Sequence, residues 1–542
     1  MTEYVFQQND RKEEQVKTVT PGLFYTPERG YGYFTKESAN GEKILTLPEL
    51  NTGFYLEEGD VKGPKWGIPV SFLADVDSPG TYWLTVELEA KEEETEVLVF
   101  AARRQLVFKG SMSAHVSRTF SFPITLTDFI PGDTKERHPC RFVSVTVISQ
   151  SVGFKKITVK KWKGTTIYLA GDSTVTDQCA TPPYQPGTSY GGWGQMLPAF
   201  IGELKAVSNH AHSGLTTESF RAEGHFEIMM ESVRPGDVCL FQFGHNDQKL
   251  KHLKAEEGYR ENLIEYIKEV QKKGAFPVLV TPLARNSWNG KEGSYRDLLE
   301  EYAGEVINIG KEESVPVADL HRKSMEFLKQ HGLEDSKRWF YPSDYTHTND
   351  YGAYQMAKFL CEELSDLKIL PPNLNGFGDW EPLKSNNDNR ITNKINLVSD
   401  LERPEEALSR AEALDFVIRT VNFFPMNTYH TSFLDVAGDE WYAGVVACGV
   451  QNGLITCEMT REGRFYPDKE VTLEEFLWMA MTGYLSRKSV KQSLGPEIEG
   501  TLFWTKKMVS IACGLGMADP DDDWKRCISR KEAAALLDGF EL

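Results

Sequence analysis

The chain has 542 residues, enough for three or four domains of ordinary size that each bury their own core. A composition of 40% hydrophobic and 26% charged residues is that of a globular protein and excludes a disordered chain or a fibrous repeat. The net charge of −19 argues against a general nucleic-acid-binding protein, which needs a basic surface.

The sequence also argues against a membrane protein or a secreted protein held by disulfides. No stretch reaches about 18 consecutive apolar residues, and the segment from Met1 to Asp10 lacks the basic and apolar regions of a signal peptide. The eight cysteines are sparse, without Cys-x-x-Cys spacing. We therefore expect reduced thiols, no metal and a cytoplasmic location; a signal already removed would make the protein cell-wall associated instead.

Residues 1–164 are expected to form a β-sandwich. Short β-branched and aromatic runs, separated by turn-forming residues, predict strands at 81–88, 97–100, 142–147 and 156–159. No helical periodicity comes between them, and two packed sheets are the natural arrangement for so many short strands.

Residues 165–370 show the pattern of an α/β domain. Apolar strands are expected at 166–170, 237–243, 276–280 and 315–318, with helices between them, as at 259–272, and a closing helix from Asn349 to about Leu364. Strands that alternate with helices predict a parallel sheet covered on both faces, an α/β/α three-layer sandwich. Residues 371–403 are rich in turn formers and predict a linker, and residues 404–542 predict a helical module.

Four polar segments lie near the expected strand ends, where ligands bind in open α/β sheets. They are Gly171-Asp172-Ser173-Thr174, Ser213-Gly214-Leu215, Gly244-His245-Asn246-Asp247 and Asp344-Tyr345-Thr346-His347. Taken singly, each is compatible with a turn or a helix cap: Ser173 is expected at a strand-to-helix turn, and an Asn246 amide could donate to an oxyanion. A carboxylate three residues before a histidine could orient its imidazole.

In this order, the four segments resemble the GDSL-like, or SGNH, hydrolases. Together with Gly192-Trp193-Gly194-Gln195 they closely resemble the rhamnogalacturonan acetylesterases, over about residues 165–366. The resemblance implies a flavodoxin-like α/β/α domain and acyl transfer from an acetylated oligosaccharide, with no cofactor. It implies Ser173 as nucleophile, His347 as base and Asp344 as its orienting carboxylate.

The same resemblance implies an oxyanion hole made by the backbone N–H groups of Ser173 and Gly214 and the amide of Asn246. Trp193 and His245 are candidates for substrate contact, although Trp193 could equally be packing and His245 could shape its loop. Asp319 and His321 are expected to be structural.

The flanking parts carry weaker resemblances. The N-terminal part is similar to a galactose-binding-like jelly roll, which could bind sugar or support the hydrolase. In the C-terminal part, the segments that begin at Leu408, Val471 and Ile528 repeat a capped acidic first turn and an apolar helix. They resemble S-layer homology repeats, but Leu473 stands where that family carries Arg. We expect a structural or substrate-shaping use of these repeats.

The sequence thus predicts an O-acetylesterase for pectic oligosaccharides, with no nucleic-acid or membrane partner and with its oligomeric state left open. Two alternatives remain: an acetylesterase for another glycan such as xylan, and a non-catalytic glycan-binding protein.

Overall fold

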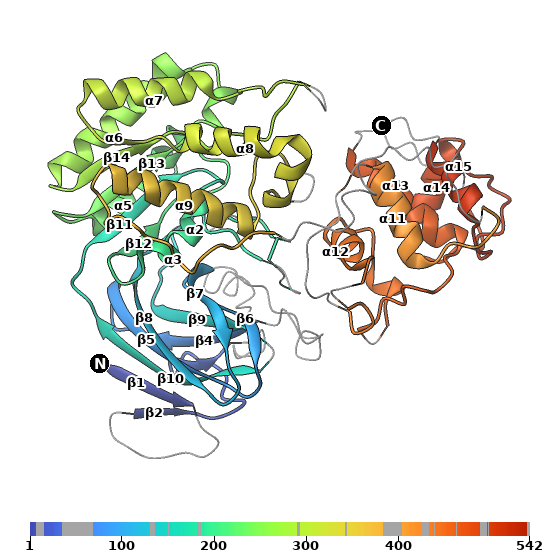
Figure 1. The fold of residues 1–542 in the computed structure, drawn as a ribbon, viewed down its shortest axis with the longest axis horizontal. Helices are drawn as coiled ribbons and strands as arrows, with labels where there is room; N and C mark the ends of the chain where they lie inside the picture. The colour runs from blue at the N-terminus through green and yellow to red at the C-terminus, as the bar shows by residue number, and fades with distance from the viewer. Residues whose placement is uncertain are drawn as a thin grey trace. The chain divides into compact units, whose positions relative to one another are not determined.

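The structure is a computed structural model in which helices and strands form two compact units, of residues 1–61 with 67–381 and of residues 62–66 with 382–542 (Figure 1). It describes residues 1–6, 16–34, 69–130, 136–149, 151–180, 184, 186–187, 189–289, 293–341, 344–382, 404–421, 423, 433–437, 440–461, 463–487, 496 and 498–538. Most of the predicted linker, residues 383–403, therefore lies outside the described residues. None of the helices in the described ranges is long and apolar enough to cross a membrane.

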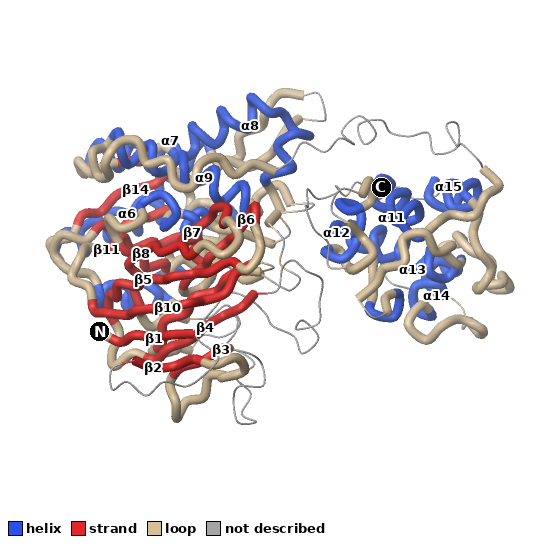
Figure 2. Tube along the Cα trace, turned by 60° about the horizontal axis from the view of Figure 1, so that its bottom comes forward, coloured by secondary structure: helices blue, strands red, loops and turns tan. Residues whose placement is uncertain are grey.

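The first unit begins with two five-stranded sheets that share one core (Figure 2). Their orders are β2-β1-β10-β5-β8 and β3-β4-β9-β6-β7. Burial alternates along the strands, as at Leu84, Val86 and Leu88 of β5, so one face of each sheet is apolar. The strands are β1 (Thr2–Phe6), β2 (Val16–Val19), β3 (Tyr31–Tyr33), β4 (Pro69–Asp75), β5 (Gly80–Ala90), β6 (Glu94–Ala101), β7 (Gln105–Met112), β8 (Ser117–Leu126), β9 (Phe142–Ile148) and β10 (Val152–Lys161).

A third, fully parallel sheet follows directly, in the order β12-β11-β13-β14-β15. This is the flavodoxin-like order, and it confirms the predicted α/β domain. Its strands are β11 (Thr166–Gly171), β12 (Ala206–Asn209), β13 (Val238–Gln242), β14 (Phe276–Val280) and β15 (Val317–Ala318). The helices are α2 (Trp193–Met196), α3 (Pro198–Ile201), α4 (Ser219–Ala222), α5 (His225–Ser232), α6 (Arg260–Lys272), α7 (Glu300–Glu312), α8 (Leu320–Ser336) and α9 (Asp350–Asp366).

Helices cover both faces of this sheet, so strands β11, β12 and β13 are buried along their whole length. In β11, Ile167 and Leu169 join one apolar cluster with α2, α3 and α9, whereas Tyr168 and Ala170 join a second with α5, α6 and α7. The first cluster also contains Leu98, Phe100, Leu106 and Ile148 from the sandwich strands. The sandwich and the α/β domain therefore share a core, which is why they form one compact unit.

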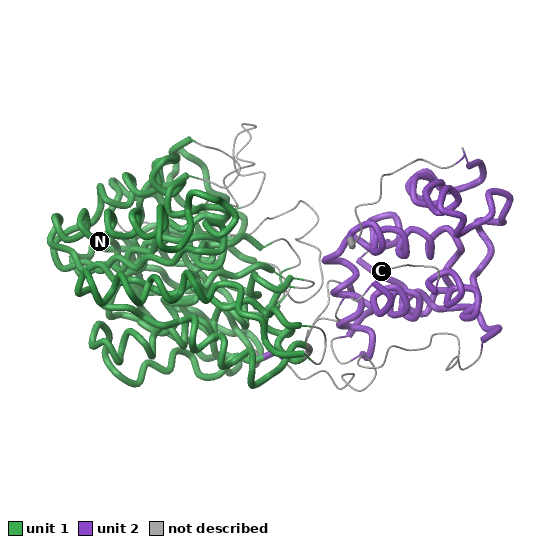
Figure 3. Tube along the Cα trace, turned by 90° about the horizontal axis from the view of Figure 1, so that it is seen from above, with its two compact units in different colours: residues 1–61, 67–381 green, residues 62–66, 382–542 purple. Residues whose placement is uncertain are grey.

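The described part of the second unit is helical (Figure 3). Its helices are α11 (Arg410–Thr420), α12 (Ala443–Gln451), α13 (Leu473–Arg487), α14 (Lys506–Gly514) and α15 (Arg530–Asp538). The N–H of Leu408 donates to the carbonyl of Ile528 at 3.0 Å, Ile528 to Val471 at 3.2 Å, and Val471 back to Leu408 at 3.0 Å. Equivalent residues of the three repeats thus close a ring of backbone hydrogen bonds.

Ion pairs join arginines at the helix starts to glutamates of neighbouring segments. Arg410 pairs with Glu475 of the next repeat at 3.1 Å, and Arg530 pairs with Glu412. Leu473 leaves the third link of this series unmade, and Glu532 pairs instead with Arg526 at 3.0 Å.

Candidate active site

Ser173 lies on a tight turn at the carboxyl end of strand β11, the second strand of the parallel sheet. The carboxylate of Asp172 holds this turn, since its Oδ1 accepts from the N–H of Thr174 at 3.0 Å and from the Thr174 hydroxyl at 2.8 Å. A side chain at Gly171 would meet Cγ2 of Val175 at 2.5 Å, so the turn requires glycine there. The predicted helix directly after Ser173 is wrong: residues 173–175 form turns, and α2 begins only at Trp193.

His347 and Asp344 come from the loop that precedes α9. Nε2 of His347 lies 2.7 Å from Oγ of Ser173, and its Nδ1 lies 2.7 Å from Oδ2 of Asp344. Burial alone would raise the pKa of Asp344. Hydrogen bonds from the His347 ring and from the N–H groups of His347 and Thr346 outweigh burial and lower it. Asp344 is thus an ionised acceptor, which favours the tautomer with the proton on Nδ1 and a free lone pair on Nε2.

The start of α9 fixes the position of this histidine. Asn349 caps the helix by accepting from the N–H of Gly352 at 3.1 Å, and its amide donates to the carbonyl of Phe340 at 3.0 Å. The carbonyl of His347 accepts from the N–H of Tyr341 at 2.9 Å. The ring of Tyr190 stands edge-on to His347, with centroids 5.5 Å apart.

Three hydrogen-bond donors face the same space beside Ser173. The N–H groups of Ser173 and Gly214 donate to no acceptor within the described residues. Gly214 has φ +84, in the left-handed region that favours glycine. The Asn246 amide donates to the carbonyl of Leu215 at 3.0 Å, while its oxygen accepts from Nζ of Lys249 at 2.8 Å. One N–H of Asn246 therefore remains for a ligand, and the three donors suit a developing oxyanion.

These groups line one open cavity of about 420 Å³. The lining residues are Ser173, Gln178, Tyr190, Ser213, Gly214, His245, Asn246, Lys249, Arg285, Thr346 and His347. The structure thus brings together all the predicted triad and oxyanion-hole residues except Asp344, which contacts the cavity through His347.

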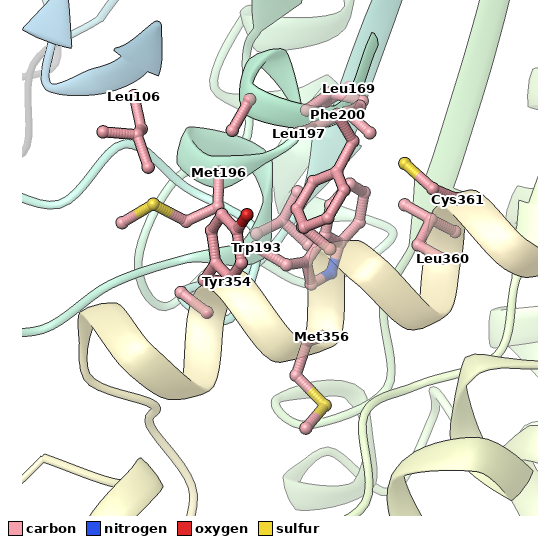
Figure 4. Packing of buried hydrophobic residues seen from close by; sticks show 14 of the residues in the cluster. Leu106, Leu169, Trp193, Met196, Leu197, Phe200, Tyr354, Met356, Leu360 and Cys361 are labelled. Carbon is pink, nitrogen blue, oxygen red and sulfur yellow. The ribbon is translucent and has the colours of Figure 1, made fainter. Parts of the chain in front are cut away.

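Trp193 does not contribute to the cavity, so the prediction that it contacts substrate is wrong. Its side chain is 1% exposed and belongs to the apolar cluster that includes residues of α3 and α9 (Figure 4). Its Nε1 donates to Oε1 of Gln242 at 2.8 Å, and Gln242 in turn donates to the hydroxyl of Thr174 at 2.6 Å. The indole therefore supports the turn that carries Ser173 through Gln242.

His245 lines the cavity, but its ring is turned inward. Nδ1 lies 3.1 Å from Oδ2 of Asp172, Nε2 lies 2.9 Å from the carbonyl of Leu283, and the residue is 2% exposed. The sequence also predicted that His245 contacts substrate. The burial of its ring and the partners of both ring nitrogens contradict this prediction. His321 is also structural: it pairs with Asp297 at 2.8 Å rather than with Asp319.

Sequence reasoning missed a residue of the sandwich that reaches beneath the site. Arg104, at the β6–β7 turn, is fully buried and donates to Oδ1 of Asp350 at 2.8 Å and to the carbonyl of Gln178 at 2.9 Å. It also donates to the carbonyl of Tyr190. The side chain of Gln178 donates to the carbonyl of Ser173 at 2.9 Å. Only a neighbouring Arg-Arg pair marks this turn in the sequence, and nothing there indicates a partner in α9.

Comparison with known proteins agrees with this geometry. The model of the GDSL-like Lipase/Acylhydrolase family matches residues 169–354. The chain belongs to this family and is a carboxylic-ester hydrolase.

Among its relatives, rhamnogalacturonan acetylesterase RhgT of Bacillus subtilis (strain 168) is 35% identical over 216 residues, 38% of this chain and 90% of the relative. The probable rhamnogalacturonan acetylesterase YesY of the same organism is 33% identical over 211 residues, 38% of this chain and 94% of the relative. The crystal structure of Bacillus subtilis protein YxiM, at 23% identity and a TM-score of 0.37, covers 68% of this chain and 99% of that one.

Proposed function

We propose that this protein removes O-acetyl groups from pectic, rhamnogalacturonan-type oligosaccharides through an acyl-enzyme on Ser173. The observation that carries the proposal is the hydrogen-bonded series from Ser173 Oγ through the His347 ring to Asp344, with both links at 2.7 Å, beside three oxyanion donors. The names of the two Bacillus subtilis relatives support the substrate class.

The geometry supports a two-step acyl transfer. Oγ of Ser173 attacks the acetyl carbonyl while Nε2 of His347 accepts its proton, and Asp344 stabilises the imidazolium that forms. The oxyanion takes hydrogen bonds from the N–H groups of Ser173 and Gly214 and the amide of Asn246. His347 then protonates the departing sugar oxygen. In the second step it deprotonates a water that releases acetate and restores the serine.

The lining of the cavity supports a short acyl group on a polar alcohol. Among the described residues that line it, none has an aliphatic side chain or is phenylalanine; hydroxyl, amide, imidazole and cationic groups dominate. A long acyl chain needs an apolar channel, because it gains free energy only when its apolar surface is removed from water. A sugar offers hydroxyls to the same polar groups.

Acetate release tests the proposal, with acetylated rhamnogalacturonan and acetylated xylo-oligosaccharides as substrates. We expect release from the pectic substrate, reduced by a factor of about 10³ or more in Ser173→Ala. Ser113→Ala, an exposed serine of the sandwich, is the matched control. Release from xylo-oligosaccharides alone would keep the mechanism and replace the substrate. Absence of hydrolysis, even of 4-nitrophenyl acetate, would favour the non-catalytic glycan-binding alternative.

For the flanking parts we propose supporting roles. The apolar residues that the sandwich shares with the α/β core, and Arg104 beneath the site, support a structural module rather than a separate sugar-binding one. The ring between Leu408, Val471 and Ile528 supports an S-layer-homology-like threefold unit whose middle repeat has lost its arginine link.

A further inference from the structure

In the part of the chain that the structure describes, two cations and no acid line the proposed catalytic cavity. Arg285 and Lys249 are the cationic lining residues, and Asp and Glu are absent from the described lining. This is unexpected in a chain with 79 acidic and 60 basic residues, whose surface is acidic on average. A local positive field at this site therefore has to come from the placement of these two side chains.

Arg285 is held at the edge of the sheet by neutral hydrogen-bond partners. It follows β14, and its backbone carbonyl accepts from the hydroxyl of Tyr295 at 2.9 Å. One Nη donates to the carbonyl of His245 at 3.2 Å, whereas the buried Nε has no hydrogen-bond partner in the part of the chain that the structure describes. The guanidinium forms no direct ion pair among the described residues, although the carboxylates of Asp172 and Asp344 interact with it electrostatically. A guanidinium has five N–H donors, so those of Arg285 that face the cavity favour an anion from outside.

Lys249 provides the second charge close to the oxyanion donors. It ends the short helix η4 (Asp247–Lys249), is exposed, and reaches Oδ1 of Asn246 at 2.8 Å. An ammonium has three donors, so two remain available. Arg285 contacts the carbonyl of His245 and Lys249 the side chain of Asn246, so the two cations hold adjacent residues of one loop beside Ser173.

We propose that Arg285 and Lys249 form a carboxylate subsite that selects acidic oligosaccharides, with a uronate residue bound beside the acetylated sugar. The inference rests on the proposed esterase function and adds its specificity-determining residues. Guanidinium and ammonium groups bind carboxylates through charge-assisted hydrogen bonds, which a neutral sugar cannot make. The subsite therefore favours uronate-containing substrates over neutral ones such as xylo-oligosaccharides.

The test compares an acetylated uronate-containing oligosaccharide with the same compound after its carboxylates are reduced to primary alcohols. We expect wild-type kcat/KM to be higher for the acidic compound by about tenfold or more, mainly through KM. Arg285→Gln and Lys249→Gln each reduce this ratio several-fold, and Arg285→Lys recovers part of it. Lys251→Gln, an exposed lysine outside the cavity lining, keeps the wild-type ratio. Added salt lowers the ratio in the wild type and changes it less in the two glutamine variants.

The outcomes separate this inference from the proposed function. Equal wild-type kcat/KM for the two compounds, or a uniform loss for both in Arg285→Gln, overturns the subsite and leaves the esterase intact. If neither compound releases acetate while 4-nitrophenyl acetate is hydrolysed, unacetylated oligogalacturonate is tested as a competitive inhibitor of that reaction. Its Ki rises in Lys249→Gln if the subsite exists; an unchanged Ki, or no inhibition, overturns it.

Discussion

The carboxylate of Asp172 lies 3.1 Å from Nδ1 of His245, and this buried pair joins the turn of the nucleophile to the loop of the oxyanion donor. Asp172 precedes Ser173, and His245 precedes Asn246, so the pair sets the spacing between two reacting groups. A carbonyl oxygen only accepts, so Nε2 of His245 donates to the carbonyl of Leu283 and its Nδ1 faces the carboxylate of Asp172. Burial alone would raise the pKa of Asp172, but His245 and Thr174 outweigh it and lower the pKa.

Removing the histidine leaves a buried carboxylate without its partner. We expect His245→Leu to lower the free energy of unfolding by about 3–5 kcal/mol and kcat by roughly 10- to 100-fold, as Asn246 shifts. Asp172→Asn is the milder change, because its amide can donate to a neutral His245. Urea unfolding and 4-nitrophenyl acetate kinetics measure both effects. A His245→Leu variant as stable as Asp172→Asn would contradict the role given to the pair.

Asn246 supplies the only side-chain donor of the proposed oxyanion hole. Asn246→Ala is expected to reduce kcat by about 10²- to 10³-fold with a small change in KM, because the lost hydrogen bond is strongest in the transition state. Asn289→Ala, which changes an exposed asparagine outside the cavity lining, is the control. A loss confined to KM would place Asn246 in ground-state binding instead.

Arg104 links the sandwich to the α/β domain through a fully buried ion pair with Asp350. Arg104→Met leaves Asp350 unpaired and is expected to cost about 3–5 kcal/mol of stability. It also removes the donor that holds the carbonyl of Tyr190, so kcat is expected to fall. Thermal unfolding and ester kinetics are compared with Arg118→Met, which changes an exposed arginine of β8. If both variants behave alike, the sandwich does not support the site through this residue.

His210 makes stability sensitive to acid. Burial, with smaller contributions from Arg103 and His225, lowers its pKa from 6.5 to about 3. The unfolded chain then binds a proton below about pH 6.5 that the folded chain does not, so stability falls as the pH decreases toward 3, by roughly 1 kcal/mol per pH unit. Urea unfolding of His210→Gln over this range should show a shallower loss than the wild type or His252→Gln, which changes an exposed histidine. Equal slopes in all three would exclude His210 as the acid-sensitive group.

The sequence was sufficient to predict the parallel sheet and the residues that meet at its edge. The closing helix was predicted from Asn349, and α9 runs from Asp350 to Asp366 with Asn349 as its cap. Ser173, Gly214, Asn246 and His347 converge because each follows a strand end or precedes a helix, positions that apolar patterning reveals.

Long-range contacts were not predictable in the same way. The unpaired state of Arg285 depends on which residues surround the end of β14, and the partner of Arg104 lies in another layer of the fold. Tryptophan is a residue type that often stacks on sugars, but the glycines beside Trp193 allow it to pack closely in the core instead. A side chain at Gly192 would meet the carbonyl of Thr176 at 2.2 Å. A short sequence motif does not reveal whether its side chains are buried or with which distant residues they form ion pairs.

The pair between Arg104 and Asp350 spans 246 positions of the chain, and synthesis delivers its members at different times. At the usual rate of translation, on the order of 10 to 50 seconds separate the two residues. During that interval the tip of the β6–β7 hairpin carries a guanidinium that lacks its buried partner and stays in water. Docking of the sandwich onto the hydrolase must therefore wait until α9 leaves the ribosome, so the newly made enzyme becomes active only after nearly all of its first unit has emerged.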